Sequence, residues 1–179
     1  MLEKIDLKKK LTKTEFGRRM EELMPKLGRL QRECQKWKIP VMIAFEGYGA
    51  SGKGVQIGEL IQGLDPRGFQ VYAVKNETEE ERMHPFLWRF WTKMPPKGRI
   101  AIYDSSWYRK VLIDRFDGKT SEKEVENSFR SIRSFEEQLT ADGMVMIKIF
   151  LAIDKKEQKK RLEKLLDSKE TAWRVSEGD

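Results

Sequence analysis

Several features that define other protein classes are scarce in this 179-residue sequence. Cys34 is its only cysteine, so no disulfide can form within the chain, which suits a reducing compartment. His84 is its only histidine and stands before a proline in a predicted turn, which makes it a weak candidate for a catalytic base. The apolar runs, such as residues 39–45, are far shorter than the roughly 20 residues that cross a bilayer, and residues 1–10 lack the apolar core of a signal peptide. We therefore expect a cytoplasmic protein that spans no membrane.

An excess of charge of one sign is present but modest. The sequence has 36 Lys and Arg residues against 29 Asp and Glu residues, a formal net charge of +7. A net positive charge favours encounters with polyanions, which include nucleic acids, phosphorylated small molecules and inorganic polyphosphate. Apart from residues 8–10, the charges are interspersed, as they are on an ordinary solvated surface. Composition alone therefore leaves the ligand open.

The N-terminal part is predicted to be helical, beginning at a capping box formed by Thr12 and Glu15. Pro25 then either kinks this helix or begins a second one. One face of the predicted helical segment carries an apolar stripe, which packs on its own domain or, alternatively, on another subunit or a neighbouring domain. We assign residues 1–38 to this N-terminal helical segment and residues 39–179 to one further domain. Apolar residues spaced by four and three form the stripe: Phe16, Met20, Leu23, Leu27, Leu30, Cys34 and Trp37.

The remaining chain alternates between predicted strands and predicted helices. Because strands separated by helices pair in parallel, this order favours an α/β fold with helices on both faces of a mostly parallel sheet. Ligands of such folds bind at the carboxyl ends of the strands. The predicted strands are 39–47, 69–74, 99–104 and 144–153, and the predicted helices are 55–64, 79–93, 121–141 and 154–169.

The segment GYGASGKG, residues 47–54, follows the first strand and precedes a helix. Its glycines allow backbone N–H groups to converge on phosphate oxygens, and Lys53 adds a positive charge. The usual phosphate loop ends in Ser or Thr, whose hydroxyl helps to hold Mg²⁺, but this segment ends in Gly54. The segment is therefore either a structural turn or a phosphate loop whose metal is held elsewhere. The expected phosphate-binding residues are Gly47, Gly49, Ser51, Gly52, Lys53 and Gly54.

Asp104 ends the strand RIAIYD, where kinases of this architecture place a carboxylate for Mg²⁺. A single Asp at a strand end is otherwise a cap or turn residue. Phosphoryl transfer also requires cations, although each cation taken singly is as consistent with a surface charge. The expected cations at the strand ends are Lys75, Arg82, Arg89, Lys97, Arg99, Arg109, Lys110 and Arg115. The residues able to stack on a nucleobase are Trp88, Trp91 and Trp107, of which the first two have the spacing of core residues.

Six sequence blocks occur in an order that is similar to a known family: EGYGASGKG, LDPRGF, TEEERMHPFLWRFW, PPKGRIAIYDSSWY, SFEEQL and IKIFLAIDKKEQ. From about Trp37 to Asp179 the chain resembles the polyphosphate kinase 2 family, which includes the polyphosphate:AMP phosphotransferases. The resemblance implies a P-loop kinase fold, a three-layer α/β/α sandwich with a helical lid. It also implies Mg²⁺-dependent phosphate transfer between inorganic polyphosphate and an adenine nucleotide, AMP or ADP. It disfavours a nucleic-acid ligand and an ordinary ATP-dependent small-molecule kinase.

Carried over position by position, the resemblance gives catalytic roles to Lys53, Asp104 and Lys110, with Asp104 as the metal carboxylate. The closing glycine of the loop is ordinary for this family, which places its metal with aspartates. The cations that would bind phosphate along the polyphosphate chain are Lys75, Arg109 and Arg115.

The chain also departs from the family pattern. The family has Asp where this chain has Gly49, and Arg where it has Ser105, Lys110 and Leu165. The loss of one carboxylate and one arginine from a site keeps its charge balanced, but it removes a metal ligand or base and a phosphate clamp. The alternative interpretation is therefore a catalytically degenerate domain that binds polyphosphate or nucleotide.

Family members continue past the position of Asp179 with the rest of the lid, a strand and a helix. Without that strand, the predicted strand 144–153 lies at an exposed sheet edge. We therefore expect residues 39–179 to be an incomplete P-loop kinase-like domain, resembling the N-terminal copy of a tandem-domain member. Such a chain would form a homo-oligomer or pair with a second domain.

Overall fold

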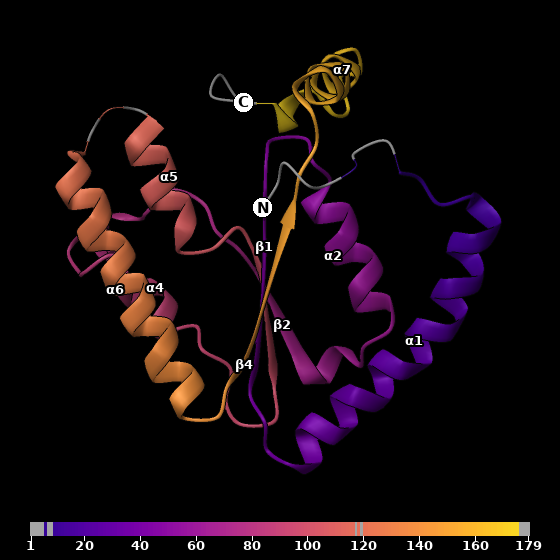
Figure 1. Cartoon of the computed structure of the whole chain (residues 1–179), viewed down its shortest axis with the longest axis horizontal. Helices are drawn as coiled ribbons and strands as arrows, with labels where there is room; N and C mark the ends of the chain where they lie inside the picture. Colours follow the sequence, from indigo (N-terminus) through magenta and orange to yellow (C-terminus); the bar gives the residue numbers. More distant parts are fainter. Residues whose placement is uncertain (1–5, 7–8, 117, 119, 176–179) are drawn as a thin grey trace.

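The computed structural model describes residues 6, 9–116, 118 and 120–175 and is built around a four-stranded sheet (Figure 1). All strands are parallel, and they lie in the order β2-β3-β1-β4. The α/β class and the parallel sheet expected from the sequence are therefore confirmed. The strands are β1 (Val41–Gly47), β2 (Phe69–Ala73), β3 (Ile100–Asp104) and β4 (Val145–Leu151).

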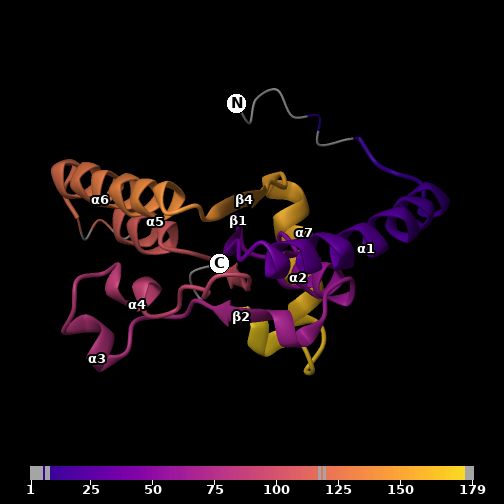
Figure 2. The same cartoon turned by 90° about the horizontal axis from the view of Figure 1, so that it is seen from below.

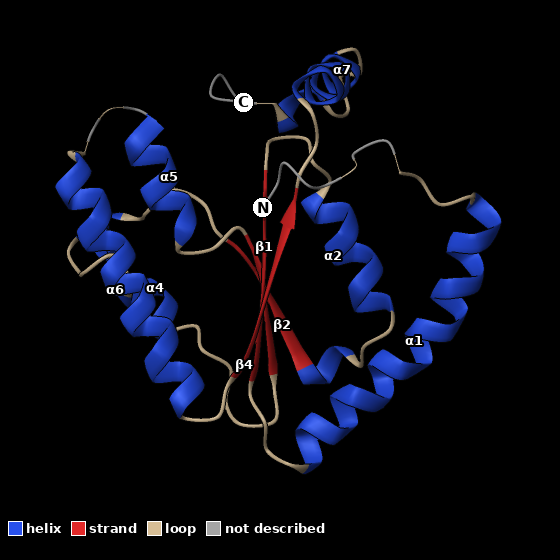
Figure 3. Cartoon of the chain, in the orientation of Figure 1, coloured by secondary structure: helices blue, strands red, loops and turns tan. Residues whose placement is uncertain are grey.

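The central strands β1 and β3 are apolar on both sides because helices cover both faces of the sheet. Figure 3 shows α1 (Lys13–Lys36) and α2 (Lys53–Gln62) on one side, and α5 (Tyr108–Phe116) and α6 (Glu122–Ala141) on the other. Alternate residues of β1 join two separate core clusters, which the sheet divides. The three-layer arrangement predicted for residues 39–179 is thus present.

α1 is one continuous helix of 24 residues with Pro25 inside it, so of the two alternatives left open at Pro25, a second helix starting there is excluded. Thr12 caps the helix by accepting a hydrogen bond from the backbone N–H of Glu15. Gln31 is buried, and its amide bonds both the backbone N–H and the backbone C=O of Asp65. The C-terminal half of α1 is thereby fixed to the sheet layer.

Two helical regions differ from the prediction. Residues 79–93 form two short helices, α3 (Glu79–Arg82) and α4 (Trp88–Trp91), instead of one. Pro85 has no N–H to donate, and a proline biases the residue before it away from helical geometry, so a single helix cannot continue. In addition, α5 has no counterpart among the predicted helices.

The chain beyond the sheet adds α7 (Lys155–Leu166), which begins at the capping side chain of Asp154 and lies past the carboxyl end of β4 (Figures 1 and 2). Two short 3-10 helices are η2 (Pro66–Gly68) and η3 (Ala172–Arg174). β4 is an edge strand, as predicted, and its Ile147 side chain is 42% exposed. In the part of the chain that the structure describes, no helix has the length and apolar character needed to cross a membrane.

Candidate functional site

The carboxyl ends of β1 and β3 lie side by side because the two strands pair with Phe45 opposite Asp104. The backbone N–H of Ser105 donates to the carbonyl oxygen of Phe45 at 2.9 Å, which extends this contact into the next turn. The loop of residues 47–54 and the turn after β3 therefore leave the sheet at one place. This is the edge at which open α/β sheets bind ligands.

Backbone geometry shapes the loop of residues 47–54. Gly47 has φ of +145° and Gly52 has φ of +99°, angles at which a residue with a Cβ is strained. A Cβ on Gly47 would also collide with the carbonyl oxygen of Leu151. The close approach of the β1 and β4 ends thus requires glycine at this position.

Lys53 lies at the start of α2 and closes the loop. Its Nζ donates to the carbonyl oxygen of Gly47 at 2.9 Å and to that of Tyr48 at 3.2 Å. The ammonium group and the positive end of the helix dipole therefore coincide, and this combination attracts anions. All six predicted phosphate-binding residues of the loop lie in this one turn.

Arg161 of α7 reaches the same loop. Its Nη1 donates to the carbonyl oxygens of Ala50 and Ser51 at 3.3 Å and 3.2 Å, while its Nε donates to Glu157 at 2.7 Å. The hydroxyl of Ser51 is buried, and no hydrogen-bond partner for it exists among the described residues. α7 thus brings a guanidinium group to the loop, a contact that the sequence patterns did not identify.

Glu46 is a partly buried carboxylate beside the loop, and the sequence patterns did not identify it. It accepts hydrogen bonds from the backbone N–H of Ser106 at 2.7 Å and from the Ser106 hydroxyl at 2.5 Å. Burial raises the pKa of Glu46, the bonds from Ser106 and the charge of Lys53 oppose that shift, and the charge of Asp104 adds to it. Its signal was available, since Glu46 is the only charged residue in the segment 39–47.

Glu46 and Asp104 are the carboxylates to consider for a metal ion at this edge. Among the described residues there is no group of three or more His, Cys, Asp or Glu side chains that could hold one. Mg²⁺, however, is usually held by one or two carboxylates together with waters and substrate phosphates. Glu46 and Asp104 fit that mode. Because Gly49 has no side chain to add a ligand, water and phosphate oxygens would complete the coordination of the ion.

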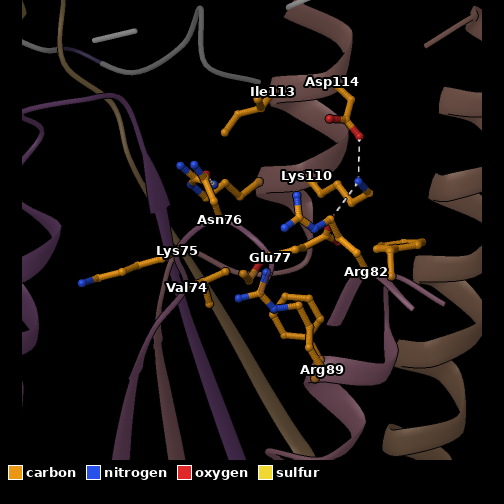
Figure 4. Close-up of a pocket in the computed structure, with 13 residues that line it drawn as sticks. Val74, Lys75, Asn76, Glu77, Arg82, Arg89, Lys110, Ile113 and Asp114 are labelled. Carbon is orange, nitrogen blue, oxygen red and sulfur yellow. Dashed lines mark hydrogen bonds and ion pairs between the residues drawn. The ribbon is translucent and has the colours of Figure 1, made fainter. Parts of the chain in front are cut away.

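A pocket of about 290 Å³ opens beside the loop, at the ends of β2 and β3 (Figure 4). Ser106 lines this pocket and bonds Glu46, so the pocket and the loop edge are adjacent. The walls combine Phe86 and Phe90 with charged groups of both signs. The charged lining residues are Lys75, Glu77, Arg82, Arg89, Arg109, Lys110 and Asp114.

The predicted catalytic Lys110 lies in this pocket, where its Nζ is 3.4 Å from Glu77 and 3.2 Å from Asp114 (Figure 4). Arg109 donates to the side-chain oxygen of Asn76 at 3.2 Å. Lys75 lines the pocket too, but Figure 4 shows its side chain pointing away from Lys110. The structure therefore brings these three predicted cations to one pocket, apart from the loop lysine.

A nearly buried ion-pair cluster supports the pocket wall. Glu81 forms an ion pair with Arg89 at 3.2 Å and accepts a hydrogen bond from Lys93 at 3.0 Å, and its carboxylate also caps α3 by accepting from the backbone N–H of Thr78. The Glu81 and Arg89 side chains are only 11% and 10% exposed. Burial alone would raise the pKa of Glu81, but the Thr78 and Lys93 hydrogen bonds and the Arg89 charge lower it below its ordinary value.

Three predicted cations lie elsewhere. Arg115 lines a separate hollow with residues of α6, not the pocket beside the loop. Lys97 and Arg99 were expected at the carboxyl ends of the strands, and this expectation is wrong. Both precede β3, which begins at Ile100, so they stand at the opposite edge of the sheet.

One of the tryptophans expected to be able to stack on a nucleobase has no open surface. Trp107 is fully buried, so it is not available to stack on a nucleobase and that expectation is wrong. Its indole N–H donates to Glu136 at 3.0 Å, and the Tyr108 hydroxyl and Lys148 also bond this carboxylate. Trp107 thus belongs to the packing between α5 and α6.

Comparison with known proteins places these features in a family. The family model for polyphosphate kinase 2 matches residues 10–179. A polyphosphate:AMP phosphotransferase of Pseudomonas syringae pv. tomato is 33% identical over all of this chain, which covers 36% of that protein. An ADP-polyphosphate phosphotransferase of Rhodopseudomonas palustris is 34% identical over 78% of this chain and 52% of its own length. The chain thus spans between about a third and about half of these relatives.

A solved structure shows the same similarity in three dimensions. Polyphosphate kinase 2 from Arthrobacter aurescens matches 99% of this chain with a TM-score of 0.91 at 30% identity, over 66% of its own chain. Agreement at this level over almost every residue confirms the P-loop kinase-like fold expected from the sequence.

Proposed function

This chain belongs to the polyphosphate kinase 2 family, and we propose that it transfers phosphate between inorganic polyphosphate and an adenine nucleotide, AMP or ADP. One observation carries the proposal. A loop that concentrates positive charge, a pair of carboxylates and a mixed pocket all open at one edge of the sheet. Phosphoryl transfer requires this combination because its catalysis is mostly positioning and neutralisation of charge.

Polyphosphate is the substrate that we assign to the loop. A chain of phosphates is uniformly anionic, so it needs a continuous run of cations rather than a shaped pocket. Lys53 begins that run, and Arg161 continues it onto α7. α7 carries six basic and two acidic side chains in its sequence KKEQKKRLEKLL.

The nucleotide is the substrate that we assign to the pocket. A nucleotide presents an apolar aromatic base, hydroxyl groups and phosphate, and the pocket offers matching features. Phe86 and Phe90 provide apolar surface, Glu77 and Asp114 provide hydrogen-bond acceptors, and Arg109 provides charge for phosphate. A volume of about 290 Å³ suits part of a nucleotide, with its phosphate pointing to the loop edge.

In the proposed step, a nucleotide phosphate oxygen forms a bond to the terminal phosphorus of polyphosphate while the bridging bond breaks. The nucleotide gains one phosphoryl group and polyphosphate loses one. Lys53 and Arg109 hold the two substrates in line, and Asp104 and Glu46 would hold Mg²⁺, which supplies neutralisation of phosphate charge. The reaction is metabolic chemistry of soluble nucleotides, so we also propose a cytoplasmic location.

The test is formation of ADP or ATP by the purified chain supplied with Mg²⁺, polyphosphate and AMP or ADP. Lys53→Ala should lower the initial rate about 100-fold or more, because it removes a charge that stabilises the transferring group. Lys97→Ala is the matched control, since Lys97 lies at the opposite edge of the sheet and should leave the rate unchanged. Equal rates in wild type and Lys53→Ala would refute the assignment of the loop.

A second candidate function is supported by Gly49 and Ser105, which stand where the family resemblance leads us to expect Asp and Arg. A chain that lacks these groups but keeps Lys53 would bind polyphosphate or nucleotide without transferring phosphate. Saturable polyphosphate binding that Lys53→Ala weakens, without any nucleotide product, would favour this binding role.

A further inference from the structure

The turn after β3 is held by carboxylates of two other elements. Glu46 of β1 accepts hydrogen bonds from the backbone N–H and the hydroxyl of Ser106. The next two residues bond Glu136 of α6, whose Oε1 accepts from the indole N–H of Trp107 at 3.0 Å and from the hydroxyl of Tyr108 at 2.8 Å. Three consecutive side chains at the start of α5 are therefore fixed by hydrogen bonds.

The residues of this turn divide between two surroundings. Ser106 and Arg109 line the pocket beside the loop, whereas Trp107 and Tyr108 bond α6 and do not line that pocket. Figures 1 and 2 show α5 and α6 side by side. Glu136 thus bonds the side of the turn that faces away from the pocket, and it does not itself line the pocket.

Lys148 of β4 completes the network around Glu136. Its Nζ donates to Oε2 of Glu136 at 2.8 Å and to the hydroxyl oxygen of Tyr108 at 3.3 Å. Burial and the hydrogen bond to Glu136 raise the pKa of Tyr108, so its hydroxyl keeps the proton that it donates. The Glu136 side chain is 15% exposed, against 46% for Lys148. The lysine can turn to water, but without the carboxylate the indole and hydroxyl protons would lose their acceptor.

Strain at Ser105 gives a reason for these restraints. Ser105 has φ of +64°, a conformation that is costly for a residue with a Cβ and persists only where its surroundings fix it. The bonds to the three following side chains supply that support. Arg109 comes next, and its backbone N–H donates to the carbonyl oxygen of Ser106 at 3.2 Å. The place of Arg109 therefore depends on how the turn is held.

We propose that Glu136 is a positioning residue, which holds Trp107 and Tyr108 so that Arg109 meets the phosphate of the nucleotide. This inference rests on the function proposed above, in which Arg109 binds that phosphate. Trp107 also packs edge-on against Phe90 and Phe135. Apolar packing has no preferred direction, whereas hydrogen bonds fix the direction of the indole and phenol groups. Small displacements of a group that binds substrate are costly, so this direction matters.

Hydrogen exchange of the whole chain, measured by mass spectrometry, tests the positioning without any substrate. Glu136→Leu should speed exchange of the amides of residues 106–112 about tenfold and leave residues 41–47 unchanged. Glu136→Gln keeps an acceptor oxygen and should stay within about twofold of the wild type. Glu137→Leu is the matched control, because Glu137 is exposed on the same helix and should change neither segment.

Steady-state kinetics separate positioning from stability. Glu136→Leu should raise KM for AMP or ADP about fivefold and leave KM for polyphosphate unchanged, since the effect passes through Arg109. Adding Glu136→Leu to Arg109→Ala should raise KM no further, because the group to be positioned is gone. Tyr108→Phe loses only the hydroxyl, and it should raise the same KM about threefold even if Glu136→Leu does not fold. In a chain without turnover, Kd for AMP takes the place of KM.

Three results would overturn the proposal. Unchanged exchange of residues 106–112 in Glu136→Leu would show that packing alone holds the turn. Equal acceleration in residues 106–112 and 41–47 would make Glu136 a general stabilising residue. A rise in KM that adds in full to that of Arg109→Ala would place its action elsewhere.

Failure of the proposed function itself would look different. A wild-type chain that neither transfers phosphate nor binds AMP would refute that function. The exchange of residues 106–112 would still decide whether Glu136 positions the turn.

Discussion

The loop of residues 47–54 and the pocket beside it share one edge of the sheet, but different interactions fix their shapes. The loop depends on backbone geometry, with positive φ angles at two glycines and Lys53 bonded to two loop carbonyl oxygens. The pocket wall depends on charged side chains, chiefly Glu81 with Arg89 and Lys93. We therefore expect the loop to accept any phosphate and the pocket to select a ligand by its shape and charge.

This difference predicts where each region is vulnerable. A backbone-built loop is damaged when a Cβ is added where none fits, and it tolerates many other changes. An ion-pair-built wall is damaged when one partner is removed, because the remaining charge stays buried without compensation. Substitutions in the two regions should therefore fail for different reasons and in different assays.

The largest stability effect is expected for Glu81→Gln in the pocket wall. It leaves Arg89 buried beside a neutral group, so the free energy of unfolding at pH 7 should fall by about 3 kcal/mol. The lowered pKa of Glu81 means that its ionised form stabilises the fold above the ordinary value of 4.5 and that this contribution is lost as the pH falls. Urea denaturation should show the gap between wild type and variant narrowing towards acid pH.

Glu80→Gln is the matched control, since Glu80 is exposed on the same helix. The role given to the ion-pair cluster would be contradicted if both variants lost the same free energy of unfolding. It would also be contradicted if the difference in stability between wild type and Glu81→Gln did not depend on pH.

Among substitutions that add one methyl group to the loop, Gly47→Ala should destabilise the fold most. The added Cβ would collide with the carbonyl oxygen of Leu151, and the φ of +145° at this residue is strained for alanine. The free energy of unfolding should therefore fall by about 2 kcal/mol. Gly58→Ala is the control, because a Cβ there has open space within α2, and it should stabilise the fold by about 0.5 kcal/mol. Thermal melts of both variants check the contrast, and a harmless Gly47→Ala would show that the loop shape is not backbone-fixed.

Arg109→Ala should affect nucleotide binding more than turnover. If Arg109 holds nucleotide phosphate equally in the ground state and the transition state, its loss raises KM for AMP or ADP about tenfold and leaves kcat nearly unchanged. Arg130→Ala, an exposed arginine on α6, serves as the control. A drop in kcat without a change in KM would instead place Arg109 with the transferring phosphate, which would erase the division between the loop and the pocket.

The smallest change is expected from restoring the family residues at the loop edge. Gly49→Asp combined with Ser105→Arg should raise the transfer rate a few-fold, because it adds a metal carboxylate and a phosphate clamp. Steady-state rates of the double variant and of both single variants measure this gain. No gain in any of them would mean that the two departures do not limit this site.

Local sequence patterns predicted the sheet and the loop because both are encoded in short segments. The run of apolar residues 41–45 predicts a strand buried on both faces, and the glycines together with Lys53 predict the loop that follows it. The contact between Glu46 and Ser106 joins residues 60 positions apart, so no local pattern reveals it. The pairing of β1 with β3 creates that contact.

The errors have equally physical causes. Lys97 and Arg99 were predicted at the carboxyl ends of the strands because they are close in sequence to Asp104. The two cations precede the five-residue strand β3, however, whereas Asp104 ends it, so they lie at opposite edges of the sheet. Pro85 divided a predicted helix, and the pocket wall formed from the two pieces. The pocket could not be foreseen, since its ion pairs depend on how α3 and α4 fold back.

The most direct test of the central claim is a crystal structure of this chain with AMP and a short polyphosphate. We predict phosphate in the loop of residues 47–54, with the Nζ of Lys53 moved from the carbonyl oxygens of Gly47 and Tyr48 to a phosphate oxygen, and nucleotide in the pocket near Arg109. A structure in which Lys53 keeps both carbonyl contacts, while phosphate and nucleotide bind elsewhere, would contradict it.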